Sequence, residues 1–137
     1  MNIEILAISK LKDPSIKSLC NHYMKRIKCF SPIELREINL KTKIPNTGKL
    51  VLLDETGEHL TSQGFAKWIQ ETGDRGTHKL TFVIGGDSGL PPEVKENKPY
   101  LLSLSKMTLQ HDLARLIFLE QLYRALTILK NHPYHRI

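Results

Sequence analysis

The chain has 137 residues, of which 40% are hydrophobic and 25% charged, a composition typical of a globular protein with a buried core. Its formal net charge of +6 favours a polyanionic partner such as nucleic acid, although solubility alone also accounts for such a charge. The N-terminus lacks the pattern of a signal peptide and no apolar run reaches membrane-spanning length, so we expect a cytoplasmic protein and not a secreted or membrane one.

In the first half of the chain, short apolar runs typical of strands alternate with segments whose apolar residues recur at helical spacing. Asp13-Pro14 combines a helix N-cap residue with proline at the first helical position, and apolar residues follow at helical spacing. The expected elements are a strand over 2–9, a helix over 14–29, a strand over 33–40, a basic loop over 41–48 and a strand over 49–54. The outer surface of the first helix is basic, which fits either a solvated face or a face that touches RNA.

The second half continues this alternation. Thr61 or Ser62 is suited to cap a helix that ends at Gly73. The elements expected after it are a strand over 80–84, a short helix that starts near Pro91, a strand over 100–104 and a helix over 111–129.

The alternation predicts an α/β fold, with one domain over 1–137, a mainly parallel sheet and helices on both faces. In such sheets, ligands bind beyond the carboxyl ends of the strands. Three segments follow predicted strand ends, namely Leu53-Asp54-Glu55, Gly85 to Leu90 and Leu104 to Leu109. We expect the functional site where these segments meet.

The glycine pair Gly85-Gly86 directly follows a predicted strand and lets the backbone pass close to a ligand, although a plain turn has the same composition. The dinucleotide fingerprint Gly-x-Gly-x-x-Gly is missing, which disfavours an oxidoreductase. The string around Asp87-Ser88 superficially resembles a serine-hydrolase motif. The supporting Asp-x-x-His near the end of the chain is missing, which disfavours a hydrolase.

The loop Leu104-Ser105-Lys106-Met107-Thr108-Leu109 is apolar, although it lies where a strand must turn into the last helix. Its backbone groups could pair with the edge of an adenine while its side chains cover the ring faces. Core packing beneath a loop is the alternative interpretation.

The chain ends in Asn131-His132-Pro133-Tyr134-His135-Arg136-Ile137, directly after the long predicted helix. Two imidazoles, a phenol and a guanidinium are unusual at a chain end, where small polar residues are common. They indicate a site that handles protons and an anionic partner. His132 and His135, with His111, lack Cys or carboxylate companions at familiar ligand spacing, so we expect no metal.

These motifs occur in an order that resembles the small SPOUT methyltransferases, which act on pseudouridine N3 in large-subunit ribosomal RNA. The resemblance runs essentially from end to end. It rests on Leu52-Leu53-Asp54, Val83-Ile84-Gly85-Gly86-Asp87-Ser88-Gly89-Leu90, Leu102-Ser103-Leu104-Ser105-Lys106-Met107-Thr108-Leu109-Gln110-His111, Leu119-Glu120-Gln121-Leu122-Tyr123-Arg124-Ala125 and Asn131-His132-Pro133-Tyr134-His135-Arg136.

The resemblance implies a C-terminal trefoil knot over roughly 80–137, a homodimer, and S-adenosylmethionine bound in the knot, with ribosomal RNA of the large subunit as substrate. The implied cofactor contacts are Leu53, Gly85, Gly86, Leu104, Ser105, Lys106, Met107, Thr108 and Leu109. The residues implied at the target base are His111, Tyr134, His135 and Arg136, with the tail reaching it across the dimer interface.

Two departures from the family stand out: the segment 41–48 is short, and Gln110 and Asp112 flank His111 where relatives often carry proline or other residues. The implied reaction must remove the N3 proton and stabilise negative charge on the ring oxygens. His135 or His111 is the candidate base, and Tyr134 and Arg136 are candidate orienting donors. A basic RNA- or ribosome-binding module without catalysis is the alternative function.

Overall fold

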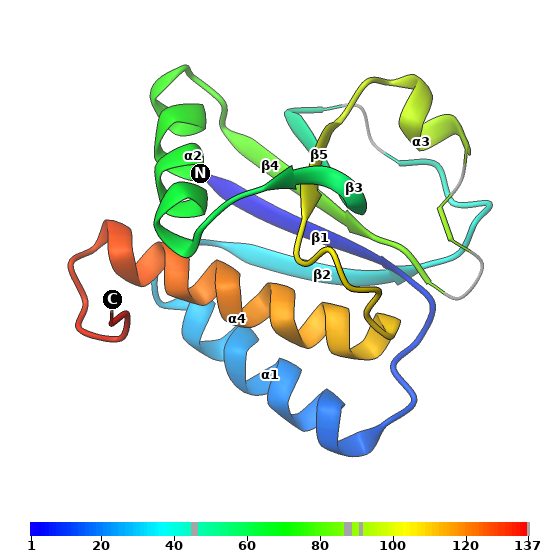
Figure 1. Cartoon of the computed structure of the whole chain (residues 1–137), viewed down its shortest axis with the longest axis horizontal. Helices are drawn as coiled ribbons and strands as arrows, with labels where there is room; N and C mark the ends of the chain where they lie inside the picture. The colour runs from blue at the N-terminus through cyan, green and yellow to red at the C-terminus, as the bar shows by residue number, and fades with distance from the viewer. Residues whose placement is uncertain (45–46, 87–88, 91, 137) are drawn as a thin grey trace.

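The computed structural model describes residues 1–44, 47–86, 89–90 and 92–136, and within them strands and helices alternate (Figure 1). The strands are β1 (Asn2–Ile8), β2 (Ile33–Ile38), β3 (Lys49–His59), β4 (Lys79–Ile84) and β5 (Tyr100–Ser103). The helices are α1 (Pro14–Lys28), α2 (Ser62–Asp74), α3 (Pro92–Glu96) and α4 (His111–Leu129). The strands of the sheet pair in parallel in the order β2-β1-β4-β3-β5. The predicted α/β class with a mainly parallel sheet is confirmed.

The two faces of the sheet carry different helices, because the connections run in opposite directions. The connections β1 to β2 and β3 to β4 move across the sheet one way and put α1 and α2 on one face. The connection β4 to β5 moves the other way, past β3, and puts α3 on the opposite face. A right-handed crossover requires this reversal. The prediction of helices on both faces is therefore confirmed, with the short α3 on the second face.

Side chains alternate between two apolar clusters along each central strand. In β1, Ile3 and Ile5 point toward α1, α2 and α4, whereas Leu6 and Ile8 point toward α3. In β4, Phe82 is fully buried and its ring lies 4.8 Å from that of Phe118 in α4. This burial on both faces explains why the strand sequences read as continuous apolar runs.

Helix α4 lies between α1 and α2 and begins at the carboxyl edge of the sheet (Figure 1). The segment 104–110 carries the chain there from β5, and the Gln110 side chain caps the helix by accepting a hydrogen bond from the Leu113 amide. Buried Arg115 then ties the first turns of α4 to the end of β1 by donating to the Ser9 carbonyl at 2.8 Å. The N-terminal end of α4 is thus fixed beside the segments that were predicted to form the site.

The predicted boundaries agree with the structure to within a few residues, except at β3. This strand was predicted to end at 54 but continues to His59, after a shift in its register with β5 between Leu53 and Glu58. The extension is polar and lacks apolar alternation, so its sequence has the character of a loop. Gly57 permits the close approach, because a Cβ there would lie 2.5 Å from the backbone of Leu101. Pro91, near which α3 was predicted to start, lies outside the described residues.

Within the described part of the chain, every helix falls short of the length and apolarity that crossing a membrane requires. In those same residues, no three His, Cys, Asp or Glu side chains gather in a way that could hold a metal ion.

Candidate functional site

A pocket of about 400 Å³ lies at the carboxyl edge of the sheet, beyond β3, β4 and β5. Its walls come from the middle of β3 and from the segments that follow β4 and β5, and these are the three segments that the sequence predicted to meet there. The described lining residues are Leu53, Asp54, Glu55, Ile84, Gly85, Gly86, Gly89, Leu90, Leu104, Ser105, Met107, Thr108, Leu109, His111 and Ala114. Its size and its mainly apolar lining are those of a small-molecule site.

The turn after β4 forms one wall, and its glycines are there for steric reasons. Gly86 and Gly89 exchange two backbone hydrogen bonds, with N to O distances of 3.4 and 2.9 Å. A Cβ on Gly86 would lie 2.3 Å from the Ile8 carbonyl oxygen, so only glycine lets the turn press against the end of β1. Asp87 and Ser88, on which the rejected hydrolase interpretation depended, lie outside the described residues.

The loop 104–109 forms a second wall and is held by its own polar groups. The Ser105 hydroxyl accepts a hydrogen bond from the Met107 amide at 2.9 Å, and the Thr108 hydroxyl donates to Glu55 at 3.1 Å. Lys106 is exposed and is not among the lining residues, in contrast to its neighbours in the loop. Met107 is 77% exposed, so its side chain stands at the open rim of the pocket.

Two carboxylates of β3, Asp54 and Glu55, line this part of the pocket. Asp54 accepts hydrogen bonds from the amide and hydroxyl of Thr56 at 2.9 and 2.7 Å, and its other oxygen lies 3.2 Å from Lys95 of α3. The Thr56 hydrogen bonds, with help from Lys95, hold the pKa of Asp54 below its ordinary value. Asp54 is therefore ionised at neutral pH, and the rim suits a ligand that carries positive charge.

His111 lines the same pocket at the first position of α4. Its Nε2 lies 3.1 Å from Oδ1 of Asp112, and Oδ2 of that buried carboxylate accepts a 3.3 Å hydrogen bond from the Lys12 amide. The Asp112 carboxylate is thus within ion-pair distance of the imidazole when that ring is protonated.

The tail leaves α4 at its other end, about 27 Å from the start of the helix by the helical rise. Asn131 adopts a positive φ of 56°, which reverses the chain after the helix. The tail then folds back, and the Tyr134 ring packs against Tyr123 at 4.7 Å. Within one chain, Tyr134, His135 and Arg136 therefore do not meet His111 or the pocket.

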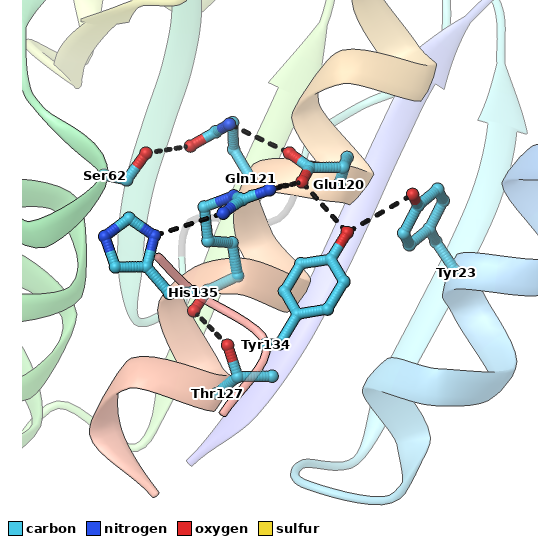
Figure 2. A network of polar contacts seen from close by, with 8 residues as sticks. Tyr23, Ser62, Glu120, Gln121, Thr127, Tyr134 and His135 are labelled. Atoms are coloured by element: carbon cyan, nitrogen blue, oxygen red, sulfur yellow. Dashed lines mark hydrogen bonds and ion pairs between the residues drawn. The ribbon is translucent and has the colours of Figure 1, made fainter. Parts of the chain in front are cut away.

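Helix α4 supplies the polar groups that hold the tail (Figure 2). The Tyr134 hydroxyl donates to Oε1 of Glu120 at 3.1 Å and lies 3.5 Å from the Tyr23 hydroxyl. Burial, with the contacts to Tyr23 and Glu120, raises the pKa of Tyr134, so the phenol stays protonated at neutral pH. Arg136 is exposed, and Ile137 lies outside the described residues.

Arg124 connects Glu120 to His135 in this cluster. Its Nε and Nη2 donate to Oε1 of Glu120 at 3.0 and 2.6 Å, and its Nη1 lies 3.1 Å from Nδ1 of His135. Glu120 and Arg124 belong to one of the motifs that carry the family resemblance, but nothing in the sequence indicated that they hold the tail. Their spacing of four residues indicated only that the two side chains can pair on one face of the helix.

A second cavity of about 310 Å³ lies between the start of α2 and α4. Ser62 and Gln121 line it and share a 2.6 Å hydrogen bond, and Leu104 lines both this cavity and the first pocket. It was not predicted from the sequence, because its walls come from elements far apart along the chain.

The chain is similar to known proteins in sequence and in structure. A family model described as "Predicted SPOUT methyltransferase" matches residues 1–135. The chain is 35% identical to ribosomal RNA large subunit methyltransferase H 1 of Clostridium perfringens, over 99% of this chain and 100% of that protein. It is 37% identical to ribosomal RNA large subunit methyltransferase H of Flavobacterium psychrophilum, over 98% of this chain and 99% of that protein. The first alignment spans 159 positions, so that relative carries residues that this chain lacks.

Two solved structures share the fold. A probable methylase family protein from Haemophilus influenzae gives a TM-score of 0.60 at 14% identity, over 98% of this chain and 70% of that chain. A methyltransferase structure from Legionella pneumophila, in complex with the bound cofactor SAM, gives 0.50 at 12% identity, over 91% and 66%.

Proposed function

The chain belongs to the SPOUT methyltransferase family, and we infer that it transfers a methyl group from S-adenosylmethionine to ribosomal RNA of the large subunit. The family model covers nearly the whole chain. The chain also aligns with its rRNA methyltransferase relatives over nearly their full length. The observation in the structure that carries this inference is the pocket at the sheet edge, in which eight of the nine expected cofactor contacts line one cavity.

The lining residues fit the cofactor in shape and in charge. The pocket has mainly apolar walls for an adenine and exposes hydroxyls of Ser105 and Thr108. Asp54 and Glu55 at its rim match the positive charge of a sulfonium or an ammonium group. Bound there, S-adenosylmethionine supplies an electrophilic methyl group. Positioning the two reactants is then the main task of the chain.

The target proposed for the methyl group is N3 of a pseudouridine. An imide nitrogen gives up its proton as it reacts, and the ring oxygens gain negative charge. The position of His111 in the pocket wall, beside the Asp112 carboxylate, supports the proposal that His111 accepts that proton. Tyr134, His135 and Arg136 offer donors to the ring oxygens or to a phosphate. A substrate in the ribosome implies action in the cytoplasm.

We further propose a homodimer in which the tail of one subunit completes the pocket of the other. The separation between tail and pocket within one chain supports this arrangement, because Tyr134 and His135 contact Glu120 and Arg124, which lie about 14–20 Å along α4 from His111. Exposed apolar side chains on the two helices of the same layer, Leu19 of α1 and Leu113 of α4, support an interface on that layer.

A trefoil knot in residues 80–137 is the corresponding proposal for the chain path. The meeting of the turn after β4 with the segment that leads from β5 into α4 supports it. A chain pulled from its two ends would then reach a fully extended length shorter than the ~3.3–3.6 Å per residue of a free chain, because the tightened knot stores residues. Extension to the full length in single-molecule pulling would contradict the knot.

Mass spectrometry of ribosomal RNA after incubation with the protein and isotopically labelled S-adenosylmethionine tests the function. We expect one labelled methyl group on a pseudouridine of the large-subunit RNA. A non-catalytic RNA-binding module would leave the RNA unlabelled and would gain no thermal stability from the cofactor, whereas a chain that binds the cofactor is stabilised by it.

Mixed dimers test the shared site. A variant with a blocked pocket (Gly85→Leu) and a variant with a disabled tail (Tyr134→Ala with His135→Ala) are each expected to be inactive. When the two are refolded together, random pairing makes about half of the dimers mixed, each with one intact site, so about a quarter of the native activity should return. No return of activity, with mixed dimers demonstrated, would contradict a shared site.

A further inference from the structure

The contacts of His135 determine which of its ring nitrogens carries the proton. Nδ1 of His135 lies 3.1 Å from Nη1 of Arg124. A guanidinium has donors on every nitrogen and no acceptor, so Arg124 can only donate in this contact. Nδ1 must therefore be the acceptor. In a neutral imidazole, the proton then resides on Nε2.

Arg124 is itself held in place by other contacts, which fix the direction of its guanidinium group. Glu120 accepts from its Nε and Nη2, which leaves the Nη1 edge directed at His135. The guanidinium carbon also lies 4.8 Å from the centre of the Tyr134 ring, a cation–π distance. The hydrogen bonds that Arg124 donates to Glu120 raise the pKa of Arg124, which keeps it charged and unable to accept.

The chain of contacts continues beyond Glu120 and anchors the cluster at α2. Oε2 of Glu120 accepts from Gln121 at 2.8 Å, and Oε1 of Gln121 accepts from the Ser62 hydroxyl at 2.6 Å (Figure 2). With one oxygen engaged by Gln121 and the other by Arg124 and Tyr134, the carboxylate has a fixed orientation. The direction of the Arg124 guanidinium follows from it.

We propose that Arg124 is a positioning residue that fixes His135 as the neutral Nε2-protonated tautomer, so that the tail histidine donates a hydrogen bond and does not accept the proton of the target base. This proposal rests on the proposed function. It assigns Nε2–H of His135 to an acceptor such as a ring oxygen of the base or a phosphate oxygen. Of the two histidines considered as the base, His111 at the pocket is then the one left for that role.

Nuclear magnetic resonance of protein labelled with ¹⁵N-histidine tests the tautomer directly, at a pH well above the ordinary histidine pKa of ~6.5. Loss of a signal in His135→Gln identifies the His135 ring. In the native chain we expect its Nδ1 to have the shift of an unprotonated nitrogen and its Nε2 that of a protonated one. A His135 ring protonated on Nδ1 overturns the proposal. The measurement is made on the native chain, and His135→Gln serves only to assign the signal.

Two arginine variants test the cause. Arg124→Met removes the donor, so His135 should show the averaged shifts of a mixture of tautomers. Arg26→Met is the matched control, because Arg26 also lies over a tyrosine, at 5.5 Å from the Tyr123 ring, and should leave the His135 tautomer unchanged. An unchanged tautomer in a folded Arg124→Met variant overturns the proposal.

Kinetics separate positioning from a merely structural role. Arg124→Met should lower kcat about tenfold, equivalent to the loss of one hydrogen bond in the transition state, and leave the KM for S-adenosylmethionine unchanged. An equal rise in that KM would indicate a disturbed pocket and overturn the positioning role. Absence of methylation by the native chain would contradict the proposed function but would leave the tautomer measurement valid.

Discussion

Individual residues at the pocket serve both the fold and the site. Asp54 ends the buried part of β3, lines the pocket and pairs with Lys95 of α3. Gly86 lines the pocket from the other side and contacts the end of β1. Substitutions at these positions should therefore change stability as well as ligand binding, and the two effects can be measured separately.

Asp54→Asn should reduce the dependence of stability on pH. Because the pKa of Asp54 in the folded state lies below its ordinary value of 3.8, the ionised carboxylate stabilises the fold above that pH. This contribution is lost as the pH falls through the folded-state pKa. We expect the variant to lose about 1–2 kcal/mol at pH 7 and to approach the native chain in stability near pH 3. Urea unfolding at both pH values measures it, and an equal deficit at both would contradict this role.

Gly86→Ala should destabilise the fold by about 1–3 kcal/mol, because the new Cβ would lie 2.3 Å from a backbone oxygen that cannot move easily. Gly73→Ala is the matched control. A Cβ there meets only the mobile end of Met1, at 2.9 Å, and alanine favours the helix, so the variant should be neutral or more stable by up to about 1 kcal/mol. Thermal unfolding compares the two, and equal effects would show that the contact with β1 is unimportant.

At the scale of elements, local signals in the sequence were sufficient where local interactions decide the structure. Asp13-Pro14 predicted the start of α1, and the Asp13 side chain accepts from the Ser15 amide at 2.8 Å. Thr61 caps α2 by accepting from the Gly64 amide. The end of β3 was predicted wrongly, because Asp54 to His59 is strand only through its pairing with β5 and carries no apolar alternation of its own.

The helix cap gives a prediction at this scale. Asp13→Ala should lower the free energy of unfolding by about 1 kcal/mol, because the amides of Ser15 and Ile16 lose their acceptor. Ser15→Ala is the control, since Ser15 contributes only its amide to this bond. Denaturant titration of both variants measures the effect, and a Ser15→Ala variant as unstable as Asp13→Ala would argue against the cap.

The candidate site was predictable in part, for reasons that differ between its two halves. The pocket follows from the rule that the ends of parallel strands meet at one edge, so its three walls could be identified before the structure, although the wall at 53–55 proved to lie within β3. The position of the tail could not be identified this way. It depends on the reversal at Asn131 and on contacts with Glu120 and Arg124, which only the packed helix brings together.

For the whole molecule, the separation of pocket and tail makes assembly the central question. Leu113→Glu should dissociate the proposed homodimer, raising its dissociation constant at least about tenfold, because a charge would enter an apolar interface. Leu40→Glu is the matched control, since Leu40 is also 44% exposed but lies in the segment after β2 and belongs to neither α1 nor α4. Light scattering after size-exclusion chromatography measures the mass.

The same two variants connect assembly to activity. Leu113→Glu should lose methyl transfer and keep cofactor binding, because Leu113 is not among the residues that line the pocket. Leu40→Glu should keep both. A monomeric Leu113→Glu variant that still methylates RNA would contradict a site shared between subunits.

Leu104 stands between two hollows of the molecule and belongs to the lining of both. The two hollows therefore lie next to each other at this residue. We expect Leu104→Ala to enlarge the first hollow toward the second, at the start of α2. Such an enzyme should bind adenosyl compounds with bulky extensions that the native chain rejects, which calorimetry with a graded series of analogues would measure.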